Sequence, residues 1–241
     1  MKERITTLTF FKYKGFRKKA WAFRMMNDAH AYLASSNGLF FYKLMGCGKD
    51  EGFNPFPDWS TYALLVVWND EADAKVFFKE SKLIKLYREN TLEDWTIYMK
   101  NITAKGAWSA QNPFEKSTTL DPNNPLIAVI TRATIKVRKL YAFWRYVPTS
   151  HLALRDNEGL IYTNGIGEVP VIQMATFSLW RDQTSLMNFA YKSQEHRTAI
   201  SKTRQLDWYK EELFSRFQPY HSEGTWGGVN PLEEYLKPSF P

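Results

Sequence analysis

The pattern of apolar and polar residues predicts the same series of elements twice along the chain. Short apolar runs, continuous or alternating with polar residues, predict strands, and longer runs with apolar residues three and four positions apart predict helices. The first half reads strand, helix, strand, strand, helix, strand over residues 5–13, 18–33, 39–46, 62–68, 71–89 and 95–102. The second half repeats this order over residues 126–137, 140–154, 159–165, 171–180, 184–206 and 209–220.

Short motifs recur between the two halves in the same order, as an internal duplication requires. Three pairs show this: Gly38-Leu39-Phe40 with Gly159-Leu160-Ile161, Gly46-Cys47-Gly48 with Gly165-Ile166-Gly167, and Gly106-Ala107-Trp108 with Gly224-Thr225-Trp226. The residues between the copies are rich in Asn, Pro and Ser, a composition typical of linkers. We therefore expect a repeat at 1–108, a linker at 109–125, a second repeat at 126–228 and a tail at 229–241.

The order β-α-β-β-α-β is that of a ferredoxin-like unit. Such a unit places both helices on one face of a four-stranded sheet and leaves the other face bare. Two units in one chain can cover their bare faces with each other. We therefore expect an α+β fold in which tandem ferredoxin-like repeats form an intrachain barrel of the dimeric α+β type, around a central cavity.

Several polar and glycine motifs have structural interpretations. Asp70 and Asp182 stand where the second helix of each repeat begins, so we interpret them as helix caps. The two Gly-X-Gly motifs do not complete a phosphate-binding sequence before a helix, and we interpret them as bulges or turns. Glu211 and Glu212 are neighbours on a predicted strand, so their side chains point to opposite faces and cannot act as a carboxylate pair.

Composition and charge narrow the class of protein. Aromatic residues make up 16% of the 241 residues, which favours an aromatic-rich core or a large apolar pocket. The single cysteine, Cys47, excludes an intrachain disulfide and a thiolate zinc cluster. No apolar run reaches the roughly 18 residues of a membrane-spanning helix. We expect a cytoplasmic protein that could also lie against the inner membrane.

The net charge of +7 is spread along the chain, and only residues 12–19 form a dense basic stretch. We interpret this stretch as a solvated loop and helix start, with contact to an anionic membrane as the alternative. Lys14-Gly15-Phe16 invites an RNA-recognition interpretation, but the aromatic strand motif of such modules is incomplete. We expect no nucleic-acid partner.

His196 is the candidate metal ligand among the four histidines. It falls inside the predicted helix 184–206, on the flank of an apolar stripe that contains Leu186, Phe189 and Ile200. A neutral imidazole there could bind iron through one nitrogen while the other donates to a carbonyl. A buried structural histidine is the alternative.

A longer set of motifs spread over both halves resembles the spheroidene monooxygenase family of carotenoid ketolases, over about residues 5–232. The motifs are Lys43-Leu44-Met45-Gly46-Cys47-Gly48, Gly165-Ile166-Gly167-Glu168-Val169-Pro170, Thr176-Phe177-Ser178-Leu179-Trp180, Trp208-Tyr209-Lys210-Glu211-Glu212 and Gly224-Thr225-Trp226-Gly227-Gly228. The resemblance implies a monooxygenase that uses haem b, O₂ and electrons from an external reductase, such as a ferredoxin system. The implied substrate is an acyclic carotenoid, oxidised at C-2 to an alcohol in one round or to a ketone in two.

The resemblance also gives expectations for individual residues. Haem-binding barrels of similar architecture take their proximal histidine from a helix of the second half, which implies His196 as the ligand of the haem iron. We expect Arg132 to contact a haem propionate or bound O₂, with a surface salt bridge as the alternative. Phe143, Trp144 and Phe177 could line an apolar substrate pocket, although core packing is the ordinary role of such residues.

Two other functions remain open at the level of sequence. A haem-dependent dehydratase of the aldoxime type would need neither O₂ nor a reductase. A non-catalytic haem-binding protein would hold haem without forming a product. The pairing of two chains into a homodimer also stays open.

Overall fold

The computed structural model describes residues 3–49, 56–146, 157–192 and 207–236, and within them eight strands form one closed barrel in the order β1-β3-β2-β6-β7-β5-β8-β4. The strands are β1 (Ile5–Lys12), β2 (Leu39–Gly48), β3 (Pro57–Trp68), β4 (Glu93–Gly106), β5 (Ile127–Ile135), β6 (Leu160–Val169), β7 (Gln173–Trp180) and β8 (Tyr209–Gly224). The barrel contains one four-stranded sheet from each half of the chain. The expected intrachain α+β barrel of tandem ferredoxin-like repeats is confirmed.

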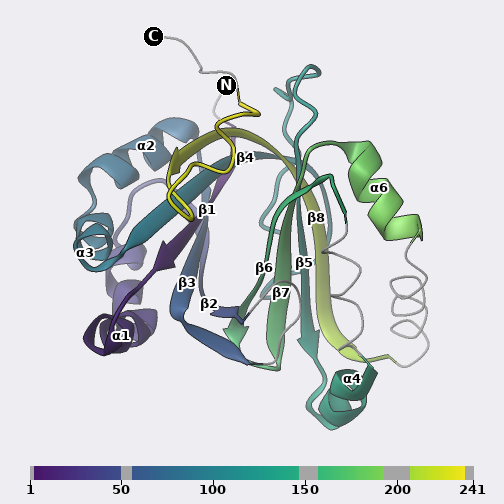
Figure 1. Cartoon of the computed structure of the whole chain (residues 1–241), viewed down its shortest axis with the longest axis horizontal. Coiled ribbons are helices and arrows are strands. Elements are labelled where there is room, and N and C mark those ends of the chain that lie inside the picture. The colour runs from purple at the N-terminus through teal and green to yellow at the C-terminus, as the bar shows by residue number, and fades with distance from the viewer. Residues whose placement is uncertain (1–2, 50–55, 147–156, 193–206, 237–241) are drawn as a thin grey trace.

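Helices cover the outside of the barrel (Figure 1). They are α1 (Phe16–Ala34), α2 (Glu71–Glu80), α3 (Lys82–Asn90), the 3-10 turn η1 (Val137–Lys139), α4 (Leu140–Tyr146) and α6 (Gln183–Lys192). The helix predicted over 71–89 is two helices, because Ser81 has an extended backbone and its hydroxyl caps α3 at the Leu83 amide. The predicted cap at Asp70 is confirmed by its bond from the Asp73 amide, and that at Asp182 by its bond from the Ser185 amide.

The two half-sheets meet along two very different seams. β4 and β8 pair over most of their length, whereas β2 and β6 pair only at Gly46 with Gly167 and at Cys47 with Ile166. The register of β2 against β3 shifts between Gly46 and Cys47, which confirms the bulge predicted there. A similar shift in β6 follows Gly167.

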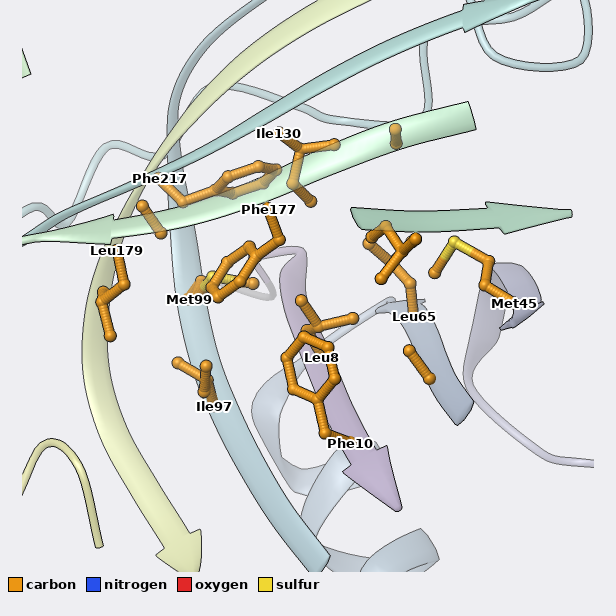
Figure 2. Close-up of a cluster of buried hydrophobic side chains, with 14 of the residues drawn as sticks. Leu8, Phe10, Met45, Leu65, Ile97, Met99, Ile130, Phe177, Leu179 and Phe217 are labelled. Carbon is orange, nitrogen blue, oxygen red and sulfur yellow. The ribbon is translucent and has the colours of Figure 1, made fainter. Parts of the chain in front are cut away.

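The interior of the barrel is filled by side chains rather than hollow (Figure 2). Phe10 of β1, Phe177 of β7 and Phe217 of β8 are completely buried there among leucine, isoleucine and methionine residues. The expected central cavity is therefore wrong, because a barrel of eight strands is just wide enough for its inward side chains to fill it. Any site for a large ligand has to lie outside the barrel wall.

Two equivalent segments supply further residues to this interior. The segment Gly106-Ala107-Trp108-Ser109-Ala110-Gln111-Asn112-Pro113-Phe114 follows β4, and Gly224-Thr225-Trp226-Gly227-Gly228-Val229-Asn230-Pro231-Leu232 follows β8. In each, the tryptophan amide donates to the carbonyl three residues on, at 2.7 Å. Each asparagine side chain accepts a bond from the amide two residues later. We call these segments the barrel caps. They show that the start of the expected linker and the start of the expected tail are copies of one structure.

Candidate functional site

The outer faces of the two half-sheets differ at one matched row of residues. In the first half this row is Leu44, Leu64, Thr9 and Thr96, which pair across β2, β3, β1 and β4. All four are buried beneath the helices, and the two threonine hydroxyls bond to each other at 2.9 Å. The equivalent row of the second half, which we call the central row, is Gly165, Thr176, Thr131 and Phe214 across β6, β7, β5 and β8.

The central row is less completely covered than its counterpart, since only Gly165 is buried, while Thr176 is half-buried and the other two residues are exposed. Thr131 is exposed although it lies in the middle of a central strand, and Phe214 is 36% exposed. The strand pairing makes Gly165 equivalent to Leu44 and Gly167 equivalent to Gly46, so the match of the two Gly-X-Gly motifs made from the sequence is wrong by two residues. A large side chain is therefore missing from this face at Gly165. One apolar cluster around Phe143 and Trp208 lies at one end of the face, and a separate one around Trp180 and Leu186 lies at the other. Between these clusters the sheet presents a glycine, two threonines and the ring of Phe214.

Arg216 lies beside the central row on β8. It pairs with Val129, whose side chain belongs to the apolar cluster around Trp180 and Leu186 on the outer face. The arginine therefore points to the same face. Its guanidinium lies 5.4 Å from the centre of the Phe214 ring, and its buried Nε has no hydrogen-bond partner. A buried N–H of a charged guanidinium is unfavourable when it has no acceptor, and an anionic group would supply one. Arg216 is therefore suited to bind a carboxylate on this face.

The predicted metal ligand His196 lies outside the described residues. Helix α6 ends at Lys192, four positions before it, and packs on the second half-sheet, with the Phe189 and Trp180 rings 5.3 Å apart. Within the described ranges, no cluster of three or more His, Cys, Asp or Glu side chains could hold a metal ion. Of the described histidines, His30 bonds Tyr42 at 2.9 Å and His221 bonds Glu223 at 3.1 Å, and neither lies on the central row.

Arg132 points into the barrel and not toward the central row. Its neighbour Thr131 faces outward, so Arg132 faces inward, where only 3% of its side chain is exposed. The guanidinium forms an ion pair with Glu211 and lies 3.6 Å from Glu168. It also lies 5.7 Å from the centre of the Trp108 ring. The sheet therefore separates Arg132 from the face that carries Arg216.

Further hydrogen bonds complete the charge network around Arg132. Glu168 accepts bonds from Lys43 at 2.5 Å and from the Trp108 indole at 2.7 Å. Glu211 accepts the backbone amides of Ala110 at 2.7 Å and Ser109 at 3.2 Å. Burial by itself raises the pKa of Glu211, but these amides and Arg132 outweigh it and hold the pKa below its ordinary value. The network ties the cap of one half to the strands of the other.

The three aromatic residues predicted for a substrate pocket do not lie together. Phe177 is completely buried in the barrel interior, whereas Phe143 and Trp144 pack on the outer face. The Trp144 indole donates to the carbonyl of Val171 at 3.2 Å. A single pocket cannot be lined by all three, because the sheet lies between Phe177 and the other two.

Arg216 and Thr131 are not among the residues predicted from the sequence, and Glu211 is set aside there because Glu212 cannot act with it as a carboxylate pair. Both faces of β5 are apolar near Ile127–Ile130, so alternation along the strand does not reveal which residues point outward. The difference between the repeats could have pointed to this face, since Gly165 and Thr176 stand where the first half has Leu44 and Leu64.

A depression of about 60 Å³ lies at the narrow seam between β2 and β6. Its lining is mostly glycine and apolar, and includes Gly46, Gly167, Pro57, Pro170 and Val171. The two Gly-X-Gly motifs thus form a thin part of the barrel wall. None of its lining residues is charged, so the depression suits a small, mainly apolar group.

No family model matches the chain. The spheroidene monooxygenase of Rhodobacter capsulatus is 33% identical over 230 residues, which cover 95% of each chain. That of Cereibacter sphaeroides is 33% identical over 231 residues, covering 95% of this chain and 71% of the relative.

Solved structures share the fold at low sequence identity. A crystal structure of an aldoxime dehydratase in complex with butyraldoxime superposes with a TM-score of 0.64 at 12% identity, covering 95% of this chain and 83% of that one. A likeness at this identity establishes the shared barrel architecture alone. The sequence comparisons go further, because one-third of the residues match over nearly the full length of both chains. The chain belongs to the spheroidene monooxygenase family.

Proposed function

We propose that this protein is a haem-dependent monooxygenase that oxidises an acyclic carotenoid at C-2, using O₂ and electrons from an external reductase. The observation that carries the proposal is the 33% identity over 230 residues to a protein named spheroidene monooxygenase. The exposed part of the central row supports it, since Thr131 and Phe214 leave accessible surface on the second half-sheet, whose strands β7 and β8 flank α6 in the sequence.

The described residues of this face fit haem. A porphyrin is flat and mostly apolar with two carboxylates on one edge. The central row carries small side chains at Gly165, Thr176 and Thr131, an aromatic ring at Phe214, and Arg216 beside it. In the proposal His196 ligates the iron and Arg216 binds a propionate. The bound haem would supply the activation of O₂. Thr131 and Thr176 would bring hydroxyl groups to the same face.

The proposed reaction balances in two identical rounds. Each round inserts one oxygen atom of O₂ into a C–H bond, while the other oxygen leaves as water with two electrons from the reductase and two protons. One round gives an alcohol. A second round at the same carbon gives a gem-diol, which loses water to form a ketone.

The first test is the visible spectrum of purified protein with and without added haem. We expect a Soret band that shifts or disappears in His196→Ala. The matched controls are His30→Ala and His221→Ala, since both histidines have other partners in the structure. A Soret band that changes only in a control variant would assign the iron ligand to that histidine instead of His196. The absence of any Soret band would contradict haem dependence.

The second test is turnover of an acyclic carotenoid with O₂ and a reductase system. We expect products heavier by one oxygen atom, or by one oxygen atom less two hydrogens, and incorporation of ¹⁸O from ¹⁸O₂. Dehydration of an aldoxime without O₂, in the absence of carotenoid turnover, would favour the dehydratase alternative.

A further inference from the structure

Large apolar side chains protrude from one edge of the molecule, next to the seam between β2 and β6. The most exposed are Phe16 (87%), Tyr141 (82%), Val137 (72%), Phe56 (66%), Phe23 (58%) and Trp59 (53%). They belong to α1, the start of β3 and the η1–α4 segment, and we call them together the aromatic edge. Figure 1 shows α1, the start of β3, the β6–β7 turn and α4 along the lower side of the barrel.

Direct contacts connect these segments into one surface. The Phe23 and Trp59 rings pack edge to face, 5.6 Å apart, and join α1 to β3. Pro57 then lies with Pro170 and Val171 around the seam depression, which joins β3 to the β6–β7 turn. The bond from the Trp144 indole to the Val171 carbonyl joins that turn to α4. The edge therefore runs from one half of the barrel to the other.

The charge along this edge is strongly positive. Residues 14–24, 56–60, 136–145 and 169–173 contain nine lysine or arginine residues and one acidic residue, Asp58. Lys14, Arg17, Lys18, Arg138 and Arg145 are exposed. Asp58 is occupied by bonds from Ser60 and Thr61. Arg24 and Lys136 are paired with Asp28 and Asp207, which lie outside these ranges. The same surface thus presents protruding rings and an excess of exposed positive charge.

We propose that the aromatic edge docks the protein on an anionic lipid bilayer. Trp, Phe and Tyr side chains favour the boundary between headgroups and acyl chains, and nearby Lys and Arg attract anionic headgroups. The exposed rings come from three segments far apart in the sequence, and a fluid lipid surface accommodates such a spread more readily than a rigid protein surface. No described helix is long and apolar enough to cross a membrane. The proposal rests on the exposed residues and not on the proposed oxygenase activity.

The test is flotation of the full chain with vesicles of phosphatidylcholine alone or with a third of phosphatidylglycerol. We expect binding to the anionic vesicles that weakens with salt. Lys14→Glu with Arg17→Glu lowers the partition coefficient by at least about tenfold, since each basic residue near such a surface adds substantially to binding. The matched charge control is Lys79→Glu with Lys82→Glu, on α2 and α3 away from the edge.

Ring insertion is tested with brominated lipid, which quenches tryptophan at the acyl-chain boundary. We expect quenching in the wild type and a clear reduction in Trp59→Phe, which keeps an aromatic ring and retains binding; the remaining signal is expected from Trp144 on the same edge. Absence of anionic-vesicle binding, or equal loss in the control pair, overturns the proposal. Binding instead to an acidic ferredoxin, sensitive to Lys14 and Arg17, would also overturn it and make the edge a protein-docking surface. The Soret band and carotenoid turnover in detergent are measured separately, so failure here leaves the proposed function unaffected.

Discussion

Glu93 and Glu211 hold equivalent positions in the two halves of the barrel, and each binds the cap that the other half provides. Glu211 accepts the amides of Ser109 and Ala110, and Glu93 accepts those of Gly227 and Gly228. Each glutamate also has a cation from the first strand of its own half. For Glu211 this is the buried Arg132, and for Glu93 it is the partly exposed Lys12, 3.6 Å away.

This difference in burial predicts unequal effects of neutralising the two glutamates. Glu211→Gln leaves the buried Arg132 short of negative charge and should destabilise the fold by about 2 kcal/mol. Glu93→Gln affects a solvated pair and should cost less than about 1 kcal/mol. Urea unfolding at neutral pH measures both. Equal losses of unfolding free energy in the two variants would contradict the inference that Arg132 needs its glutamate more than Lys12 does.

The stabilising effect of Glu211 should depend on pH. Its pKa is held below the ordinary value in the folded state, so its contribution is complete above the unfolded pKa of about 4.3 and is lost as pH falls through the folded pKa. The difference in unfolding free energy between wild type and Glu211→Gln should therefore be constant above about pH 5 and shrink below about pH 4. A difference that grows toward acid would be inconsistent with this sign.

The caps predict contrasting costs for two glycines with positive φ. Gly106 has φ of +97°, and a Cβ there would overlap the carbonyl oxygen of Glu212. Gly228 has φ of +87° but nothing within 4 Å of the Cβ position. Gly106→Ala should cost more than about 3 kcal/mol, since a backbone clash adds to the strain, whereas Gly228→Ala should cost about 1 kcal/mol. Thermal unfolding of both variants provides the measurement.

Filling the central row should block ligand binding without harming the fold. Thr131 is exposed, so Thr131→Phe places a ring over the row and should lower haem affinity by at least about tenfold, or about 1.4 kcal/mol. The melting temperature of the haem-free protein should change little. Thr131→Val keeps the volume and is the matched control for Soret titration. Unchanged affinity in Thr131→Phe would place the haem elsewhere.

Arg216→Ala should weaken haem binding through the loss of one charge-assisted contact, by roughly 1.5–3 kcal/mol. Haem dimethyl ester lacks the free propionates, so its binding should be the same in wild type and variant. A similar loss for both ligands would show that Arg216 acts through packing and not through a carboxylate.

The sequence predicted the barrel and its duplication because those depend on element order and on motifs that recur at nearly fixed spacing. It could not predict which face Arg132 and Phe177 occupy. Strand β5 is apolar on both faces over Ile127–Ile130, so apolar residues stand at consecutive positions there and the period of two is hidden. The placement of Arg132 follows only from the register with β7 and β8. The expected cavity failed for a related reason, since inward side-chain volume depends on all eight strands together.

The exchange of caps makes each half incomplete by itself. Trp108 and Phe114 leave the first repeat to pack with residues of the second, while Trp226 and Leu232 pack back against the first. A cap therefore becomes stable only after contacts more than 100 residues apart in the chain have formed, as between Ala110 and Glu211. Folding should be slow for a protein of this size, and the two repeats should unfold together in one transition rather than in sequence. A chain cut within 118–124 would yield two fragments that are unstable alone and regain structure only when mixed.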